Sequence, residues 1–96
     1  VLPEETNALT YPILDKNIPN PFNTSTTIGY YLPTMTANAS IYVYDMNGIQ
    51  LKSYPITEKG KGNVIIQGSE LNAGMYLYAL IADGKVIDTK RMILTK

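Results

Sequence analysis

The chain has 96 residues, of which 45% are hydrophobic and 17% charged, so it can form one globular domain around one core. Its eight Lys and Arg residues are balanced by eight Asp and Glu residues, which argues against nucleic acid or an anionic membrane as the partner, because both attract a basic surplus. Cysteine and histidine are absent, which excludes disulfide bonds, thiolate metal sites and a histidine general base.

The first dozen residues read as a linker. Pro3, Glu4 and Glu5 show no hydrophobic period, so we expect residues 1–12 to connect an upstream protein to a folded domain over residues 13–96. The sequence begins without the charged and apolar segments of a signal peptide, and we expect a fragment or the tail of a longer chain. No apolar run approaches the roughly 20 residues of a membrane-spanning helix.

Short strand-like runs alternate with turn residues through the rest of the chain. Seven such runs, with no segment of helical period, predict an all-β antiparallel sandwich. We expect one short helical turn at most, within residues 69–74. The predicted strands cover residues 11–16, 25–32, 40–46, 49–56, 62–67, 74–82 and 85–95.

Two prolines shape the segment that follows the first predicted strand. Pro19 and Pro21 lack N–H donors and fix φ near about −65°, and Asn20, lying before a proline, favours extended backbone. The segment must therefore be extended, yet it cannot lie in the middle of a sheet. We expect it to run along a sheet edge and turn there, with Phe22, the only phenylalanine, as a buried anchor.

The Asp-Met-Asn-Gly sequence at residues 45–48 predicts a hairpin turn, and its length decides which side chains share a face. A two-residue loop would place the apolar residues of the two flanking strands on opposite faces, whereas a three-residue loop, which pairs Asp45 with Ile49, would place them on one face. We expect the second, a type I turn with Gly48 in the left-handed conformation and a G1 bulge. Tyr42 and Tyr44 favour the first, because they could form an apolar face of their own. The apolar residues concerned are Ile41, Val43, Ile49 and Leu51.

Residues 74–82 are apolar on both faces of the predicted strand. Tyr76 and Tyr78 lie on one face, and Leu77 and Ile81 lie on the other. Such a strand is either central with a covered outer face, or it presents that face to a partner. Simple crowding of a small core explains the pattern equally well.

Asp83-Gly84 is a second hairpin signal and joins the last two predicted strands. The register of this hairpin stays open, because residues 92–94 are apolar on both faces.

No constellation of catalytic residues is present. The serines have no histidine to activate them, and the carboxylates form no evident acid–base pair. Asp45 and Asn47 lack the rest of a calcium loop, and Gly60 and Gly62 read as a flexible connection between strands. We therefore expect no enzymatic activity, cofactor or metal. The eight tyrosines fit strand positions better than a sugar-binding platform.

Taken in order, these motifs resemble the C-terminal sorting domain, type A, of proteins exported by type IX secretion. The resemblance covers roughly residues 14–96, and it departs from the family pattern at Thr24, where proline is common, and at Gly29, where a polar residue is usual. The matched positions are Pro19, Asn20, Pro21, Phe22, Asn23, Thr26, Thr27, Ile28, Tyr30, Leu32, Pro33, Val43, Tyr44, Asp45, Gly48, Leu71, Gly74, Tyr76, Tyr78, Leu80, Lys90, Met92, Leu94 and Lys96.

The resemblance implies an immunoglobulin-like β-sandwich that folds in the periplasm of a Gram-negative bacterium. It implies three partners: the type IX translocon, an outer-membrane shuttle protein and a surface sortase. The domain would carry its upstream cargo across the outer membrane to the cell surface or the medium, and the sortase would then usually cleave within or just before residues 1–12. The residues implied in translocon recognition are Pro19, Asn20, Pro21, Phe22, Asn23, Asp45, Gly48, Gly74, Tyr76, Tyr78, Lys90, Met92, Leu94 and Lys96.

For the mechanism, we expect the last hairpin and the C-terminal strand to face the translocon. Main-chain groups on the edge of that strand would add to a partner sheet, with Lys90 and Lys96 orienting the encounter. Without the resemblance, the same lysines and Arg91 would be read as charges that protect an edge strand from aggregation. The alternative function is an immunoglobulin-like adhesive or carbohydrate-binding module of a surface protein.

Overall fold

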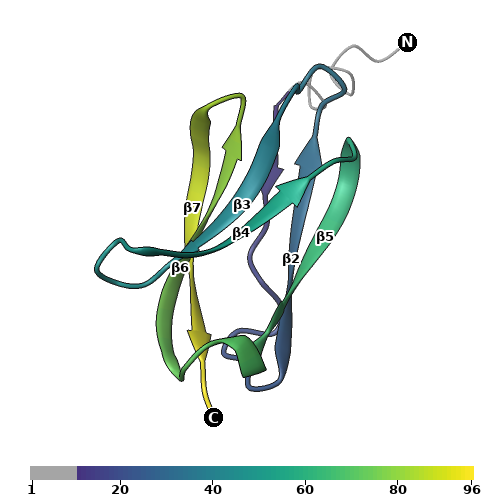
Figure 1. The fold of residues 1–96 in the computed structure, drawn as a ribbon. Helices are drawn as coiled ribbons and strands as arrows, with labels where there is room; N and C mark the ends of the chain where they lie inside the picture. Colours follow the sequence, from purple (N-terminus) through teal and green to yellow (C-terminus); the bar gives the residue numbers. More distant parts are fainter. Residues whose placement is uncertain (1–10) are drawn as a thin grey trace.

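The computed structural model describes residues 11–96, which form two antiparallel sheets packed face to face (Figure 1). The predicted all-β, immunoglobulin-like sandwich is therefore confirmed. The sheets have the strand orders β1–β2–β5 and β4–β3–β6–β7. Most of the predicted linker falls on residues 1–10 and lies outside the described residues. The elements are β1 (Ile13–Leu14), β2 (Ser25–Leu32), β3 (Ala39–Tyr44), β4 (Gln50–Ile56), β5 (Gly60–Gln67), a 3-10 turn η1 (Gly68–Glu70), β6 (Gly74–Ala82) and β7 (Lys85–Leu94).

The core lies between the sheets and follows from alternation along each strand. Every second residue of β2, for example, is buried or half-buried on the inner face, while the residues between them face outward. Strands of this kind cannot shift register by one residue without exposing their apolar set. The core consists of Leu14, Phe22, Ile28, Leu32, Ile41, Val43, Ile56, Ile66, Leu71, Tyr76, Tyr78, Leu80, Met92 and Leu94.

Each predicted strand is present, although its bounds differ in places. The strand predicted for residues 11–16 is the shortest, because only Ile13 and Leu14 form the ladder of β1. Beyond β1 the segment still follows β2, where Asp15 N–H donates to the Gly29 carbonyl at 2.9 Å. The short helical turn is also present, and it begins at Gly68, just before its predicted place.

The turn at residues 45–48 has the predicted length. The N–H of Asp45 donates to the carbonyl of Ile49 at 3.0 Å, and the N–H of Gly48 donates back to the carbonyl of Asp45 at 3.1 Å. Gly48 has φ of 86°, the left-handed conformation that glycine adopts most easily. The Asp45 carboxylate accepts hydrogen bonds from the N–H groups of Asn47 and Ile49, which fixes the loop from inside.

Beyond the turn, however, the register of β3 against β4 shifts by one residue. Leu51 is left without a partner as a bulge, and Lys52 faces Val43 across the ladder. Leu51 is consequently 41% exposed, and Ile49, which lies in the turn before β4 begins, is 58% exposed. The prediction that they share the buried face of β3 is wrong, because the bulge inverts the alternation at Leu51 and Ile49 lies beyond the end of the ladder.

The hairpin between β6 and β7 turns through Asp83 and Gly84. Their φ values of 51° and 80° are both positive, as in a type I′ turn. The register shifts between Leu80 and Ile81, so that Ile87 is an extra residue on β7. The Asp83 carboxylate also accepts hydrogen bonds from two N–H groups of the loop between β2 and β3, at 2.9 Å each.

β6 is a central strand between β3 and β7, and its outer face is not covered by any element of residues 11–96. Met75 is 42% exposed on that face, whereas Leu77 and Ile81 are half-buried. Ala79 is buried there by its neighbours alone. Apolar residues on both faces of β6 therefore reflect a central strand whose outer face remains partly exposed.

We predict that Gly48→Ala lowers the free energy of unfolding by about 1 kcal/mol, because alanine is disfavoured at positive φ. No atom lies within 4 Å of an added Cβ, so the loss comes from the backbone alone. Urea denaturation measures it. Asn47→Ala is the matched control, since only the main chain of Asn47 bonds to Asp45. Equal stability of the Gly48→Ala variant would contradict the left-handed turn.

Candidate functional site

Two segments far apart in the sequence lie side by side along the edge of β7, and together they contain most of the predicted recognition residues. We call residues 19–23 and residues 90–96 the seam. The N–H of Phe22 donates to the carbonyl of Ile93 at 2.9 Å, and the N–H of Thr95 donates to the carbonyl of Phe22 at 2.7 Å. This forms a parallel bridge between Phe22 and Leu94. The sequence predicted that the Pro-rich segment runs along an edge, but it did not identify which edge.

The side chain of Asn20 takes the place of a further peptide unit on this edge. Its Oδ1 accepts a hydrogen bond from the N–H of Ile93 at 3.0 Å, and its Nδ2 donates to the carbonyl of Arg91 at 3.3 Å. The prolines on either side have no N–H to offer β7. An amide side chain between two prolines thus pairs with a strand where the main chain cannot.

Phe22 anchors the seam in the core, as predicted. It is 2% exposed, and Met92 and Leu94 are buried beside it in the same cluster. A phenylalanine contributes roughly 1.5–3 kcal/mol when fully buried. These three recognition candidates are therefore structural anchors whose side chains a partner cannot reach in the folded domain.

A buried polar network attaches residues 15–19, which lead into the seam, to β2 of one sheet and to β6 of the other. The Tyr78 hydroxyl donates to the carbonyl of Asp15 at 2.9 Å and accepts from the N–H of Asn17 at 2.8 Å. Asn17 Nδ2 donates to Thr26 Oγ1 at 3.0 Å, and Thr26 Oγ1 donates to the carbonyl of Pro19 at 2.7 Å. Burial raises the pKa of the Tyr78 hydroxyl above its ordinary value, against an opposing contribution from its hydrogen bond to Asn17.

Asn17 is only 3% exposed, and no sequence argument identified it. A buried asparagine needs partners for its amide group, and here Nδ2 donates to the carbonyl of Pro19 and to Thr26 Oγ1, while Oδ1 lies 3.5 Å from the Tyr78 hydroxyl. The signal in the sequence is weak, because an asparagine before a proline-rich segment usually reads as a loop residue. Only the position of Tyr78 across the sandwich gives it this role.

Gly68, at the start of η1, is a second residue that sequence reasoning missed. A Cβ there would lie 2.7 Å from the carbonyl oxygen of Asn23, 3.0 Å from that of Thr24 and 3.1 Å from a methyl carbon of Leu94. The Gly68 N–H donates to the Thr24 carbonyl at 2.7 Å. The close approach of two backbones explains the glycine and places η1 directly against the seam.

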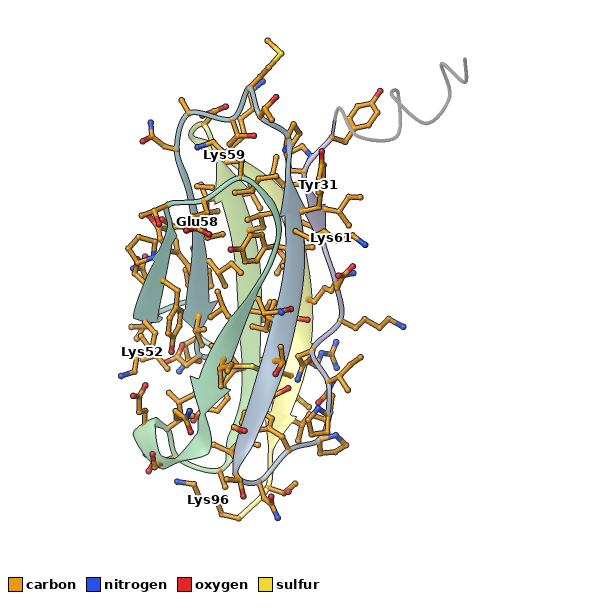
Figure 2. The ribbon with its side chains drawn as sticks, turned by 90° about the vertical axis from the view of Figure 1, so that its right-hand side faces the viewer. Tyr31, Lys52, Glu58, Lys59, Lys61 and Lys96 are labelled. Atoms are coloured by element: carbon orange, nitrogen blue, oxygen red, sulfur yellow. The ribbon has the colours of Figure 1, made fainter. Side chains whose placement is uncertain are left out.

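The lysines of the seam differ in environment. Lys90 is half-buried and pairs with Asp88 at 3.3 Å. Lys96 is exposed at the lower end of the sandwich (Figure 2), and its Nζ donates to the carbonyl of Leu71 at 2.6 Å. A partner would meet the Lys96 ammonium more readily than that of Lys90.

The remaining predicted site residues lie elsewhere. Asp45 and Gly48 form the β3–β4 turn, which projects away from the seam (Figure 1). Tyr76 is buried, and its hydroxyl donates to the carbonyl of Asn72. Gly74, with φ of 153°, begins β6 opposite Leu94. The predicted set is thus divided among a seam, the core and a distant turn.

The exposed part of the seam is a polar main-chain surface with prolines. Pro19, Asn20, Pro21 and Asn23 are exposed, as are Arg91 and Thr95 on the facing strand. Among residues 11–96 no cluster of three or more His, Cys, Asp or Glu residues lies together, and no helix there is long and apolar enough to cross a membrane. Such a surface suits recognition by another protein.

A comparison with known protein families identifies the chain. The family model of the secretion system C-terminal sorting domain matches residues 16–95, so the chain belongs to the family of type IX secretion C-terminal sorting domains. No curated protein and no solved structure matches the chain. Membership implies a type IX secretion system, an upstream cargo and export to the cell surface or the extracellular space.

We predict that Asn20→Ala uncovers the edge of β7. It removes two exposed hydrogen bonds, so the free energy of unfolding falls by about 1 kcal/mol and the Ile93 amide exchanges faster with solvent. Hydrogen exchange followed by NMR measures both the free energy of unfolding and the exchange rate of the Ile93 amide. Asn23→Ala is the control, because the Asn23 side chain bonds only to its neighbour Thr24. An unchanged Ile93 amide would show that Asn20 does not cover the edge.

We predict a second effect at alkaline pH. Because burial raises the pKa of Tyr78, the unfolded chain loses this proton first, and the free energy of unfolding falls as pH rises above about 10. Tyr78→Phe lowers stability at pH 8, since it leaves buried partners unpaired, but it makes the decline above pH 10 shallower. Urea titrations at pH 8 to 11 measure the free energy of unfolding of both proteins. The difference between the two cancels the contribution of lysine titration, which both share. Parallel declines would contradict the role given to the hydroxyl.

Proposed function

We propose that this domain directs an upstream cargo protein through the type IX secretion system and across the outer membrane of a Gram-negative bacterium. The match over residues 16–95 carries the proposal. The domain folds in the periplasm, is bound there by the translocon and an outer-membrane shuttle protein, and is then usually removed by a surface sortase. It acts as a recognition element and has no catalytic role.

The seam supports a specific form of this proposal. Residues 19–23 and 90–96 form one surface only when the domain is folded, because their pairing needs both sheets in place. A partner that binds this surface therefore recognises only the folded domain. The family motif and the basic C-terminal strand are recognised as one composite surface in this proposal.

The position of β1, the first strand after the proposed linker, supports cleavage after recognition. Ile13 pairs with Tyr31 near one end of β2, whereas Ser25 begins β2 beside the seam. The eight residues of β2 separate these two ends by about 23 Å, at roughly 3.3 Å per residue. The C-terminus lies at the end of the sandwich opposite β1 (Figure 1). A sortase acting within residues 1–12 would thus have access while the translocon holds the seam.

The alternative, an adhesive or carbohydrate-binding module, gains no specific support. Stacking on a sugar ring needs exposed aromatic faces that lie in one plane. Tyr42 and Tyr44 are neighbours, but their rings meet edge to face at 74°. Tyr76 and Tyr78 are buried.

We predict that a fluorescent reporter, exported to the periplasm and followed by residues 1–96, reaches the surface or the medium of a type IX-competent cell. Loss of this signal when the secretion system is disabled establishes the sorting role. Lys96→Ala should lower export several-fold, because it removes the exposed ammonium of the seam. Lys85→Ala is the matched control, since Lys85 is exposed at the opposite end of β7. A folded reporter fusion that stays in the periplasm would refute the proposal.

A further inference from the structure

The outermost strands of the two sheets differ in how their edges are protected. An open edge displays unpaired N–H and C=O groups, so proteins usually cover or interrupt it. β1 has only two residues and follows Pro12. The edge of β7 is covered by the seam, and nearer the hairpin the N–H of Thr89 is taken by the side chain of Asp88. The edge of β4 is interrupted by the Leu51 bulge and by Pro55.

This arrangement bears on the expectation that the C-terminal strand adds to a partner sheet. The main-chain groups of β7 that would accept such a partner, from Arg91 to Thr95, are already bonded to Asn20 and Phe22. A partner strand would have to displace the seam before it could pair there. An edge that is already open needs no such rearrangement.

β5 has the least protected edge of the described residues. It contains eight residues and no proline, and it pairs with β2 over its whole length without a register shift. No strand within residues 11–96 lies on its other side. Figure 2 shows β5 running across the front of the sandwich, with β2 beside it.

The hydrogen bonds of β2 identify which groups of β5 point outward. Thr27 bonds through both its N–H and its C=O to Ile18, and the Gly29 carbonyl accepts a hydrogen bond from the N–H of Asp15. The main-chain groups of odd-numbered β2 residues therefore point toward β1 and the segment that follows it. The main-chain groups of even-numbered β2 residues therefore point toward β5, where their hydrogen-bonded partners are also even-numbered. The main-chain groups that point to the open edge belong to Lys61, Asn63, Ile65 and Gln67.

The side chains of the same residues are exposed, which makes this edge accessible from the outer face as well. Ile65 is 56% exposed, and the stretch from Asn63 to Gln67 carries no charge. Lys59 and Lys61 lie at the upper end of the strand (Figure 2), and neither forms an ion pair with any residue of 11–96.

We propose that the open edge of β5 is a docking site for an extended strand of the secretion machinery. The partner strand adds to the β1–β2–β5 sheet through the outward N–H and C=O groups of Asn63, Ile65 and Gln67. An acidic side chain of the partner lies beside Lys59 and Lys61, which fixes its direction along the edge. This inference rests on the proposed function, because it names a second surface by which the translocated domain is held.

We test it with Ile65→Pro and Ile65→Ala in the reporter fusion. Proline removes an N–H that points away from β2, and prolines are tolerated on edge strands, so the ladder with β2 is kept. Alanine removes the same apolar side chain but keeps the N–H. We expect Ile65→Pro to lower export at least about tenfold and Ile65→Ala to lower it less than about twofold. Equal export of Ile65→Pro and the unchanged fusion overturns the β5 site.

The failures of the two proposals are distinguishable. If the unchanged fusion is not exported, the sorting role fails; if it is exported and Ile65→Pro is exported equally, only the β5 site fails. Thermal unfolding of the isolated Ile65→Pro domain shows whether it folds.

Should that variant unfold, Lys59→Glu with Lys61→Glu replaces it, because both side chains are exposed and form no ion pair. We expect several-fold lower export at unchanged stability, and unchanged export overturns the site.

A binding measurement adds a direct readout. Hydrogen exchange of the domain, with and without detergent-solubilised outer membranes of a type IX-competent cell, should show new protection at the amides of Asn63, Ile65 and Gln67. Unchanged exchange at these amides overturns the proposal. Sedimentation of the domain alone should show a monomer; a dimer that Ile65→Pro abolishes assigns the edge to a second copy of this chain and overturns a strand of the machinery as its occupant.

Discussion

The fold depends on one segment, residues 13–22, that is bonded to both sheets and that we call the crossing segment. Residues 13–18 pair with β2, and residues 20–22 pair with β7 of the other sheet. Within the first region, the hydroxyl of Tyr78 bonds to the carbonyl of Asp15 and to the N–H of Asn17, whose side chain is buried. No buried side-chain polar atom of residues 11–96 lacks a hydrogen-bond partner. A buried network in which every polar group is hydrogen-bonded specifies one arrangement of the segment, because any shift would leave several polar groups without partners at once.

This constraint also explains how the strand edges are managed. A short sandwich with an N-terminal strand of only two residues would leave the edge of β7 open along its apolar end. The crossing segment closes that edge with one main-chain bridge and one amide side chain. Because the segment is used on this side of the sandwich, nothing comparable remains for β5. The asymmetry between a covered and an open edge is thus a consequence of the topology.

Much of the fold could be predicted from the sequence because its signals are local. Alternation located the strands, and the two prolines with Asn20 required an extended segment at an edge. What failed depended on contacts between distant residues. The bulge exposes Leu51, whose side chain alternation placed on the face of Ile41 and Val43, because β3 and β4 adjust their register after the turn. Gly68 is needed only because the backbone of Asn23 and Thr24 passes over it. No local pattern contains either fact.

The same distinction applies to the candidate site. The sequence grouped the motif residues into one candidate set, but it could not separate those that build the domain from those that a partner can touch. Phe22, Tyr78, Met92 and Leu94 are buried, so their presence in the motif is explained by folding. In the proposed function, a translocon that binds the exposed surface of the seam binds only the folded domain, since that surface exists only when the buried residues are in place. The proposal thus couples recognition to folding through the same few hydrogen bonds, and it requires that a variant that loosens the seam weakens both.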